Sequence, residues 1–364
     1  MKILFDHQAF SMQVYGGISR YFIEIIKNFP TEIQTEISVK YSNNHYLNEL
    51  YPNKTNSFFP KYNFKGKKIL ANKINNFYSS KDIKKSDYSI FHPTYYDPYF
   101  LNNIGKKPYI VTIHDMVHEK FPNVFSPFDK SAEWKRKIAS KASAIIAVSE
   151  NTKKDIIEMY NIHPEKITVI YHGFFNVPDI KISIENLNIN FNYIIYIGSR
   201  NRYKNFVSWL MAIADILKNK TDLHIICVGG DKFTQQEISL FEDLKLKKRL
   251  HQFSVDDKML SKLLNNALAF VFPSKYEGFG IPILEAFANE CAVMCSNKSS
   301  LPEVAGDASE YFDPYQPESM QSAFNNLVFD EKYRYELIQK GKIQLENFSW
   351  KKTAEQTVNI YTKF

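Results

Sequence analysis

The sequence predicts an α/β protein made of two doubly wound domains, each built on a parallel sheet. The chain has 364 residues, which is enough for two domains of roughly 150 residues each. Short apolar segments alternate with helical segments, as expected where helices cover both faces of a parallel sheet. The alternation is interrupted at residues 173–192 and then resumes, so this interruption is expected to be a linker.

The first domain is predicted to span residues 1–172. Apolar or β-branched runs predict its strands, and 3.6-residue periodicity predicts its helices. The expected strands are 2–5, 90–92, 109–113, 144–148 and 168–171, and the expected helices are 18–29, 132–142 and 152–160.

The second domain is predicted to span residues 193–345 and repeats this pattern. Its expected strands are 193–197, 224–228, 251–254, 269–272 and 292–296, and its expected helices are 206–217, 235–246, 258–266 and 282–289. The linker holds Gly173, Pro178 and an asparagine-rich run without periodicity. A last helical segment, 346–364, is expected to cross back to the N-terminal domain.

The composition excludes several classes of protein. With 44% hydrophobic and 23% charged residues, the chain is not expected to be disordered. Three cysteines are too few for a disulfide scaffold and suggest a reducing compartment. Asp6 and His7 interrupt the region where a signal peptide needs its apolar core. The longest apolar runs are far shorter than the roughly 20 residues of a membrane span, so a cytoplasmic protein is expected, at most peripheral on the inner face of the cell membrane.

One segment carries more positive charge than the net +7 of the whole chain. Between Lys54 and Lys85 there are nine lysines, six aromatic residues and a single acidic residue, Asp82. The segment is either a solvated basic face or a patch that docks on an anionic membrane. Nucleic acid is not expected as a partner, because the chain has few arginines and no nucleic-acid-binding motif.

Parallel α/β sheets bind ligands where loops follow the carboxyl ends of strands, so unusual residues at these positions are candidates for a site. Gly16 and Gly17 open the first long helix. They let a ligand approach the backbone closely, and a helix N-terminus favours an anion. A tight turn without a ligand is the alternative interpretation.

His114 follows the strand at 109–113 and is expected to donate a hydrogen bond or carry a proton in a cleft. A structural histidine is the alternative. His114 and His118 have the spacing of a zinc-protease helix. The segment leaves a strand and Pro122 follows it, so the two histidines are not expected to share a helical face and no zinc site is predicted.

The loop after the strand at 193–197 carries Ser199, Arg200, Arg202 and Lys204. These cations suggest a clamp for a diphosphate, because arginine offers a fork of donors and lysine a point charge. The pattern leaves open which arginine would contact the phosphates. A solvated basic loop is the alternative.

The segment 273–286 places two acidic residues around a predicted helix start. Gly278 and Gly280 free the backbone there, and Glu277 and Glu285 flank the start. One carboxylate could accept hydroxyl hydrogens from a sugar and the other from a ribose, while backbone N–H groups face a diphosphate. The arrangement would therefore suit a nucleotide sugar, and an acid pair without a ligand is the alternative.

Glu277 and Glu285 are eight residues apart, which is the E-x7-E motif of retaining glycosyltransferases. The surrounding sequence FPSKYEGFGIPILEAFA resembles the donor site of glycosyltransferase family 4, the glycosyl transferases group 1. Further segments resemble the family in the same order: YGGISRYF, TIHD, AVSENTKKDI, YHGF, YIGSRNRYKNF, LPEVAGDASEYFDP and FSWKKTAEQTVNIY. The resemblance covers nearly the whole chain, is weakest at 35–90 and 176–190, and leans toward mannosyltransferase-like members.

The resemblance implies a GT-B fold, in which two Rossmann-like domains face each other across a cleft. It implies that Glu285 holds the ribose and Glu277 the sugar hydroxyls. The implied catalytic residues are His114, Glu277, Arg200 and Lys204. The implied donor-binding residues are Gly16, Gly17, Ser199, Arg200, Lys204, Glu277, Gly278, Phe279, Gly280, Ile281 and Glu285.

The implied reaction moves a hexose, mannose or rhamnose, from a nucleotide-diphosphate sugar to a glycan or polyprenyl-linked acceptor with retention of configuration. Bacterial surface polysaccharide synthesis is the implied setting. The sequence contains no Asp-x-Asp pair, so neither a metal nor another cofactor is expected. Two alternatives stay open: a nucleotide-sugar epimerase of the same fold, and a non-catalytic module that binds membranes through its basic segment.

Overall fold

The computed structural model describes all residues except 53–55, 60, 63, 175–188, 201 and 220–221. The chain divides into two compact units. The first contains Met1–Gly173 together with Ser349–Phe364, and the second contains Phe174–Phe348. Most of the expected linker at 173–192, including Pro178, lies outside the described residues, as does Lys54.

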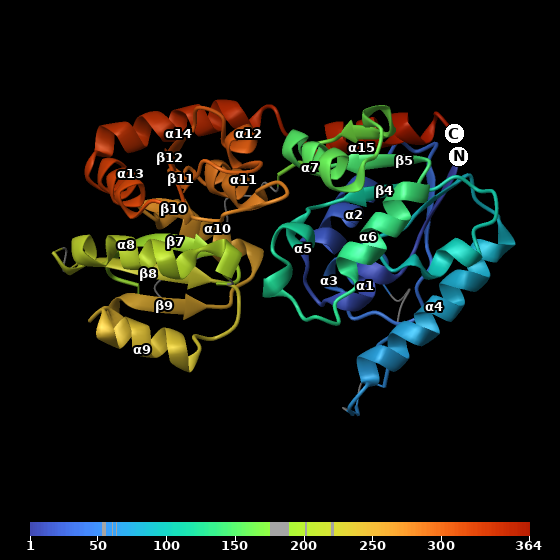
Figure 1. Ribbon diagram of the computed structural model, residues 1–364, viewed down its shortest axis with the longest axis horizontal. Coiled ribbons are helices and arrows are strands. Elements are labelled where there is room, and N and C mark those ends of the chain that lie inside the picture. The colour runs from blue at the N-terminus through green and yellow to red at the C-terminus, as the bar shows by residue number, and fades with distance from the viewer. Residues whose placement is uncertain (53–55, 60, 63, 175–188, 201, 220–221) are drawn as a thin grey trace. The chain divides into compact units, whose positions relative to one another are not determined.

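The first unit is built on parallel strands (Figure 1). Strands β2 (Gln34–Ile37), β1 (Lys2–Phe5) and β3 (Ile90–His92) form one sheet in that order, and β4 (Ile110–Ile113), β5 (Ala144–Ala147) and β6 (Ile167–Val169) form another. A parallel bridge between Phe91 and Tyr109 joins β3 to the start of β4. The expected strands are confirmed within a residue or two, but β2 was not predicted. Its residues are half-exposed apart from Ile37, and it pairs along one side only, so it lacks the apolar run that reveals a central strand.

Helices pack around these strands. They are α1 (Gln8–Met12), α2 (Gly17–Lys27), α3 (His45–Leu50), α4 (Lys67–Lys85), α5 (Val117–Lys120), α6 (Ser131–Lys141), α7 (Glu150–Tyr160) and α15 (Trp350–Tyr361), with short 3-10 helices at Pro98–Asn102, Pro122–Val124 and Pro164–Lys166. Among them, α1, α3, α4 and α5 were not predicted. The α4 sequence is rich in lysine and asparagine, and only Asn75, Ser79 and Ile83 of its residues are buried.

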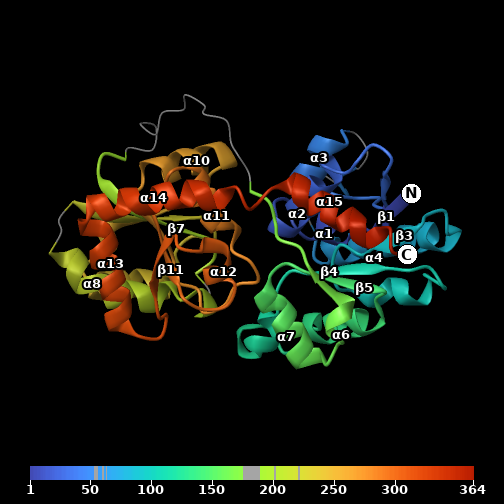
Figure 2. The ribbon, with the colours of Figure 1, turned by 90° about the horizontal axis from the view of Figure 1, so that it is seen from above.

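The C-terminal helix α15 belongs to the first unit, where it packs against α2 (Figure 2). Ser349 caps it by accepting a hydrogen bond from the Lys352 N–H. The Tyr361 hydroxyl lies 2.6 Å from His92 Nδ1, and Thr353 donates to the Tyr171 carbonyl at 2.7 Å. The last residues of the chain are therefore bonded to strands and loops formed by its first half.

The second unit contains one six-stranded parallel sheet. The strands are β7 (Asn192–Ile197), β8 (Leu223–Val228), β9 (Leu250–Phe253), β10 (Ala269–Phe272), β11 (Val293–Ser296) and β12 (Ser309–Phe312), in the spatial order β12-β11-β10-β7-β8-β9. This is the strand order of a doubly wound nucleotide-binding fold, and its direction reverses between β7 and β10. The prediction of two doubly wound parallel-sheet domains is confirmed.

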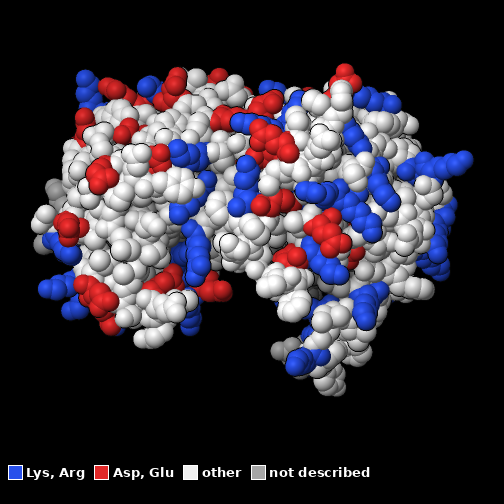
Figure 3. All heavy atoms as spheres, viewed as in Figure 1, with Lys and Arg blue, Asp and Glu red and all other residues white. Residues whose placement is uncertain are grey.

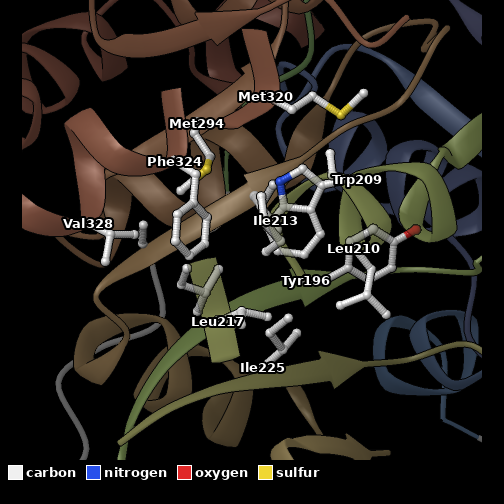
Figure 4. Close-up of a cluster of buried hydrophobic side chains, with 14 of the residues drawn as sticks. Tyr196, Trp209, Leu210, Ile213, Leu217, Ile225, Met294, Met320, Phe324 and Val328 are labelled. Atoms are coloured by element: carbon white, nitrogen blue, oxygen red, sulfur yellow. The ribbon is translucent and has the colours of Figure 1, made fainter. Parts of the chain in front are cut away.

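Helices cover both faces of this sheet. They are α8 (Phe206–Lys218), α9 (Gln235–Asp243), α10 (Asp257–Asn266), α11 (Ile281–Ala288), α12 (Leu301–Ala305), α13 (Pro317–Phe329) and α14 (Glu331–Leu345), with 3-10 helices at Arg202–Lys204 and Lys247–Arg249. On one face, Trp209 of α8 and Phe324 of α13 pack with Tyr196 and Met294 of the sheet (Figure 4). All four side chains are buried, so this core holds the carboxyl end of β7 in place. No helix of the described residues is long and apolar enough to cross a lipid bilayer.

Candidate active site

The candidate site of the second unit lies where the strand order of its sheet reverses. Because β7 and β10 are paired in parallel, with Tyr196 opposite Val271, the loops that follow them leave the same edge of the sheet. In doubly wound folds the helices that follow two such strands lie on opposite faces of the sheet, and this reversal point is where ligands bind. Both segments predicted to bind a donor, 198–205 and 273–280, are these loops.

Lys204 and Glu277 form an ion pair between the two loops. Lys204 Nζ lies 2.6 Å from Glu277 Oε1, and the two side chains are only 17% and 14% exposed. The backbone N–H of Lys275 also donates to the Tyr203 carbonyl at 2.8 Å. The structure therefore brings together two predicted site residues that are 73 positions apart in the chain.

The loop that carries Glu277 is held by two serines that follow β11. Ser299 Oγ accepts a hydrogen bond from the Glu277 N–H at 2.9 Å, and Ser300 Oγ donates to the carbonyls of Glu277 and Phe279 at 2.9 and 2.7 Å. Gly278 and Phe279 are buried in this loop. The serines thus fix the loop backbone, and sequence reasoning missed them.

Gly280 ends this loop and precedes α11. Its φ of +120° is disfavoured for residues with a side chain, and a Cβ atom here would lie 3.1 Å from Leu301 Cδ2. Ile281 and Pro282 then form the first turn of α11, whose N–H groups have no partners within the helix. Glu285 lies farther along α11 and is partly exposed. The structure thus places Glu277 before the start of α11 and Glu285 within it, and a helix start in this segment is what the sequence predicts.

Arg200 occupies a different position from Lys204. Its Nε donates to Glu237 Oε1 at 2.5 Å, its Nη2 donates to the Asp231 carbonyl at 2.7 Å, and its guanidinium lies 4.8 Å from the centre of the Phe233 ring. The Arg200 side chain is 6% exposed. Among the described residues, Nη1 has no hydrogen-bond partner.

Arg200 and Glu237 line a cavity of about 400 Å³ at the carboxyl ends of β7 and β8, with Ser199, Asp231, Lys232 and Thr234 on the same wall. Glu237 also completes a capping box with Thr234 at the start of α9. Burial alone would raise the pKa of Glu237, but the hydrogen bonds from Arg200 and the Thr234 N–H bring it below its usual value. Sequence reasoning missed Glu237, although Thr234-x-x-Glu237 is a capping-box pattern. Arg202, by contrast, is exposed.

His114 lies at the carboxyl end of β4 in the first unit. Its backbone N–H donates to the Tyr96 hydroxyl at 3.0 Å, its ring meets Tyr21 edge-on, and it stacks on His172 at a centroid distance of 6.0 Å. Nε2 is buried without a hydrogen-bond partner among the described residues. Burial lowers the pKa of His114 to about 4, so its ring is neutral at pH 7.

The other residues predicted in the first unit open α2. Gly16 is the extended residue before the helix, Gly17 begins it, and Ser19 Oγ donates back to the Gly16 carbonyl at 2.9 Å. His118 stacks on Phe125 rather than joining His114. No three His, Cys, Asp or Glu side chains of the described residues are placed to hold a metal ion.

Comparison with known proteins shows which family the chain resembles. The family described as "Glycosyltransferase Family 4" matches residues 15–174, and the family described as "Glycosyl transferases group 1" matches residues 178–344. The O-antigen chain mannosyltransferase B of Escherichia coli is 24% identical over 99% of both chains. The O-antigen chain mannosyltransferase RfbU of Salmonella typhimurium is 29% identical over 60% of both chains.

Solved structures show the same fold over the whole chain. A glycosyltransferase from Rickettsia africae ESF-5 superposes with a TM-score of 0.72 at 18% identity, covering 100% of this chain and 98% of that one. The Anabaena protein HepE in complex with UDP and glucose gives a TM-score of 0.75 at 17% identity, covering 100% of both chains. The fold is therefore GT-B. Since the two family matches together cover nearly the whole chain, the protein belongs to glycosyltransferase family 4 of the glycosyl transferases group 1 and is a glycosyltransferase.

Proposed function

We propose that this glycosyltransferase moves mannose, or else rhamnose, from a nucleotide-diphosphate sugar to a glycan or polyprenyl-linked acceptor in bacterial surface polysaccharide synthesis, with retention of configuration. The names of the two mannosyltransferase relatives support the sugar and the setting. The structural observation that carries the proposal is the Lys204–Glu277 pair, which lies at the reversal point of the sheet beside the start of α11.

In the proposed reaction, the bond between the sugar and the diphosphate breaks, and negative charge grows on the leaving diphosphate. Lys204 and the first N–H groups of α11 stabilise this charge, because fixed donors and a helix N-terminus favour an anion. Arg200 adds positive charge at the end of β7. Glu277 accepts hydrogen bonds from sugar hydroxyls and Glu285 from the ribose.

His114 enters the proposed reaction as a neutral imidazole, given its lowered pKa. Its unpartnered Nε2 can then exchange a hydrogen bond with a sugar hydroxyl. The acceptor's proton passes to the departing phosphate, and the acceptor attacks from the face that the diphosphate leaves. The reaction is proposed to need no metal ion, because the sequence lacks an Asp-x-Asp pair.

A donor screen followed by product analysis tests the proposal. GDP-mannose, dTDP-rhamnose and UDP-glucose would be compared for thermal stabilisation of the protein, and the anomer formed from the best donor would be identified by NMR. We expect an α-linked product from an α-linked donor, and free nucleoside diphosphate only when acceptor is present. Conversion of the donor without acceptor would instead indicate an epimerase, and a product whose anomeric configuration is opposite to that of the donor would contradict retention.

Lys204→Ala tests the leaving-group role, with Lys275→Ala as the matched control. Lys275 lies in the loop that carries Glu277, but its ammonium is 5.0 Å from the Tyr315 ring and has no proposed role. We expect Lys204→Ala to lower kcat by about 10²–10³, the effect of removing a donor that stabilises developing charge, with a smaller change in donor KM. A change in KM alone would show that Lys204 binds substrate and transition state equally.

We also propose that α4 and the residues before it dock on an anionic membrane that carries the acceptor. Ile69, Leu70 and Phe77 of α4 are 64%, 44% and 68% exposed, so apolar side chains stand among the lysines. In Figure 1, the first turns of α4 point away from the rest of the unit, and Figure 3 shows basic side chains around it. A solvated face explains the lysines but not the exposed apolar residues beside them.

Binding to vesicles separates these two interpretations. The exposed lysines Lys68, Lys73, Lys81 and Lys84 would be changed to Gln, and the control would change the exposed Lys248, Lys258, Lys332 and Lys340 of the second unit. At about 1 kcal/mol per lysine, the α4 variant should bind vesicles of anionic lipid up to roughly a thousandfold more weakly, with unchanged turnover of a short soluble acceptor. If both variants lose the same vesicle affinity, or if the unmodified protein does not bind vesicles at low salt, the result supports the interpretation that α4 is a solvated basic face.

A further inference from the structure

A buried lysine contacts the residue that follows His114. Lys135 of α6 has no exposed surface, and its ammonium donates to the Asp115 carbonyl at 2.8 Å and to Glu119 Oε2 at 3.0 Å. The Asp115 carboxylate lies 3.7 Å from the same nitrogen. A fully buried ammonium is costly unless it is paired and hydrogen-bonded, and three oxygens surround this one.

These contacts fix the backbone on both sides of His114. On one side, Lys135 holds the carbonyl of Asp115, the residue that follows His114. On the other side, the His114 N–H donates to the Tyr96 hydroxyl at 3.0 Å, and the Lys135 ammonium lies 5.1 Å from the centre of the Tyr96 ring. Asp115 Oδ1 also accepts from the Val117 N–H at 3.0 Å, which closes the turn that leads into α5.

We propose that Lys135 is a positioning residue for His114: it holds the 114–115 backbone so that the His114 ring keeps its place at the carboxyl end of β4. The inference rests on the proposed role of His114 in sugar transfer. Lys135 itself is buried under Tyr96 and Asp115, so it acts through them and does not touch the substrate.

Glu119 provides a control within the same cluster. It neutralises Lys135 and accepts from the Tyr160 hydroxyl, but in the described part of the chain its side chain forms no hydrogen bond or ion pair with residues 114–115. Glu119→Gln therefore removes charge from the cluster while the Lys135–Asp115 hydrogen bond remains. Lys137→Met, on the exposed face of α6, controls for loss of a lysine from this helix.

The experiment compares Lys135→Met, Tyr96→Phe, Glu119→Gln and Lys137→Met in the full chain, with kcat, donor KM, thermal stability and the NMR titration of the His114 ring as readouts. We expect Lys135→Met to lower kcat at least 30-fold with donor KM within threefold, and to raise the pH at which His114 titrates. Tyr96→Phe should lower kcat about tenfold. Glu119→Gln should lose thermal stability while keeping kcat within threefold, and Lys137→Met should match the unmodified protein.

The outcomes distinguish positioning from a purely structural role. If Lys135→Met and Glu119→Gln lower kcat equally, the cluster only stabilises the fold and the inference is wrong. If Lys135→Met does not fold, Tyr96→Phe decides, and unchanged kcat in that variant overturns the inference. The titration of His114 could shift in Lys135→Met while no protein tested, the unmodified one included, transfers a sugar. That result would contradict the proposed function, but it would still support the contact between Lys135 and the His114 segment.

Discussion

Arg200 and Glu237 form a nearly buried ion pair whose two members have different further partners. Glu237 belongs to the α9 capping box, and Arg200 also holds two loop carbonyls. Glu237→Ala should therefore destabilise the protein by about 3 kcal/mol, because it leaves a buried guanidinium without its counter-charge. Thr234→Ala removes only the cap and should cost about 1 kcal/mol. Urea denaturation measures both, and equal losses would show that only the cap matters.

Glu285 is the residue on which proposed recognition of the ribose depends. Glu285→Ala should raise donor KM roughly 30-fold, which corresponds to the loss of about 2 kcal/mol from hydrogen bonds to a charged group. The matched control is Glu290→Ala, since Glu290 is exposed just beyond the end of α11. Titration calorimetry with the donor nucleotide gives the affinities. Unchanged affinity in the Glu285 variant would remove it from the nucleotide site.

At the scale of elements, buried histidines connect β3, β4 and α15. His92 lies 2.6 Å from the Tyr361 hydroxyl of α15 and 3.0 Å from Thr112 Oγ1 of β4. Burial lowers the pKa of His92 to about 3 and that of His114 to about 4, from an ordinary 6.5. Burial also lowers the pKa of His172, which stacks on His114 and makes a tilted ring contact with Trp350 of α15.

These depressed values predict acid sensitivity. Below pH 6.5 the unfolded chain takes up protons that the folded first unit excludes, so the stability present above pH 6.5 is lost progressively as the pH falls toward 4. Each histidine contributes roughly 1 kcal/mol per pH unit over this window. Urea midpoints at pH 7, 6 and 5 measure the slope, and His92→Gln should flatten it by about one proton. Identical slopes in both proteins would show that His92 is not the group responsible.

At the scale of the whole molecule, activity is expected to survive an excess of EDTA. The charge on the leaving diphosphate is assigned to Lys204, Arg200 and the start of α11, and the sequence has no Asp-x-Asp pair to hold a divalent ion. Initial rates with and without chelator provide the measurement. Loss of activity that manganese or magnesium restores would reveal a metal site.

Much of the architecture could be predicted from the sequence, because central parallel strands are continuous apolar runs and their helices have a clear period. The same reasoning missed β2 and α4. One is a half-exposed strand with a single neighbour, and the other is a polar helix with only three buried residues. Both elements are stabilised by the surfaces against which they pack, and the local pattern of polar and apolar residues carries no information about those surfaces.

The sequence by itself determined the two-domain α/β organisation, the loops at strand ends and the E-x7-E segment, because each depends on residues close together in the chain. Only the tertiary structure decided which of these loops meet and which partner each charge takes. The parallel pairing of β7 with β10 places Lys204 beside Glu277. The pairing of β7 with β8 on its other side places Arg200 beside Glu237. Such pairings follow from the order of strands in the sheet, which is fixed by the packing of the whole unit rather than by the propensity of any one segment.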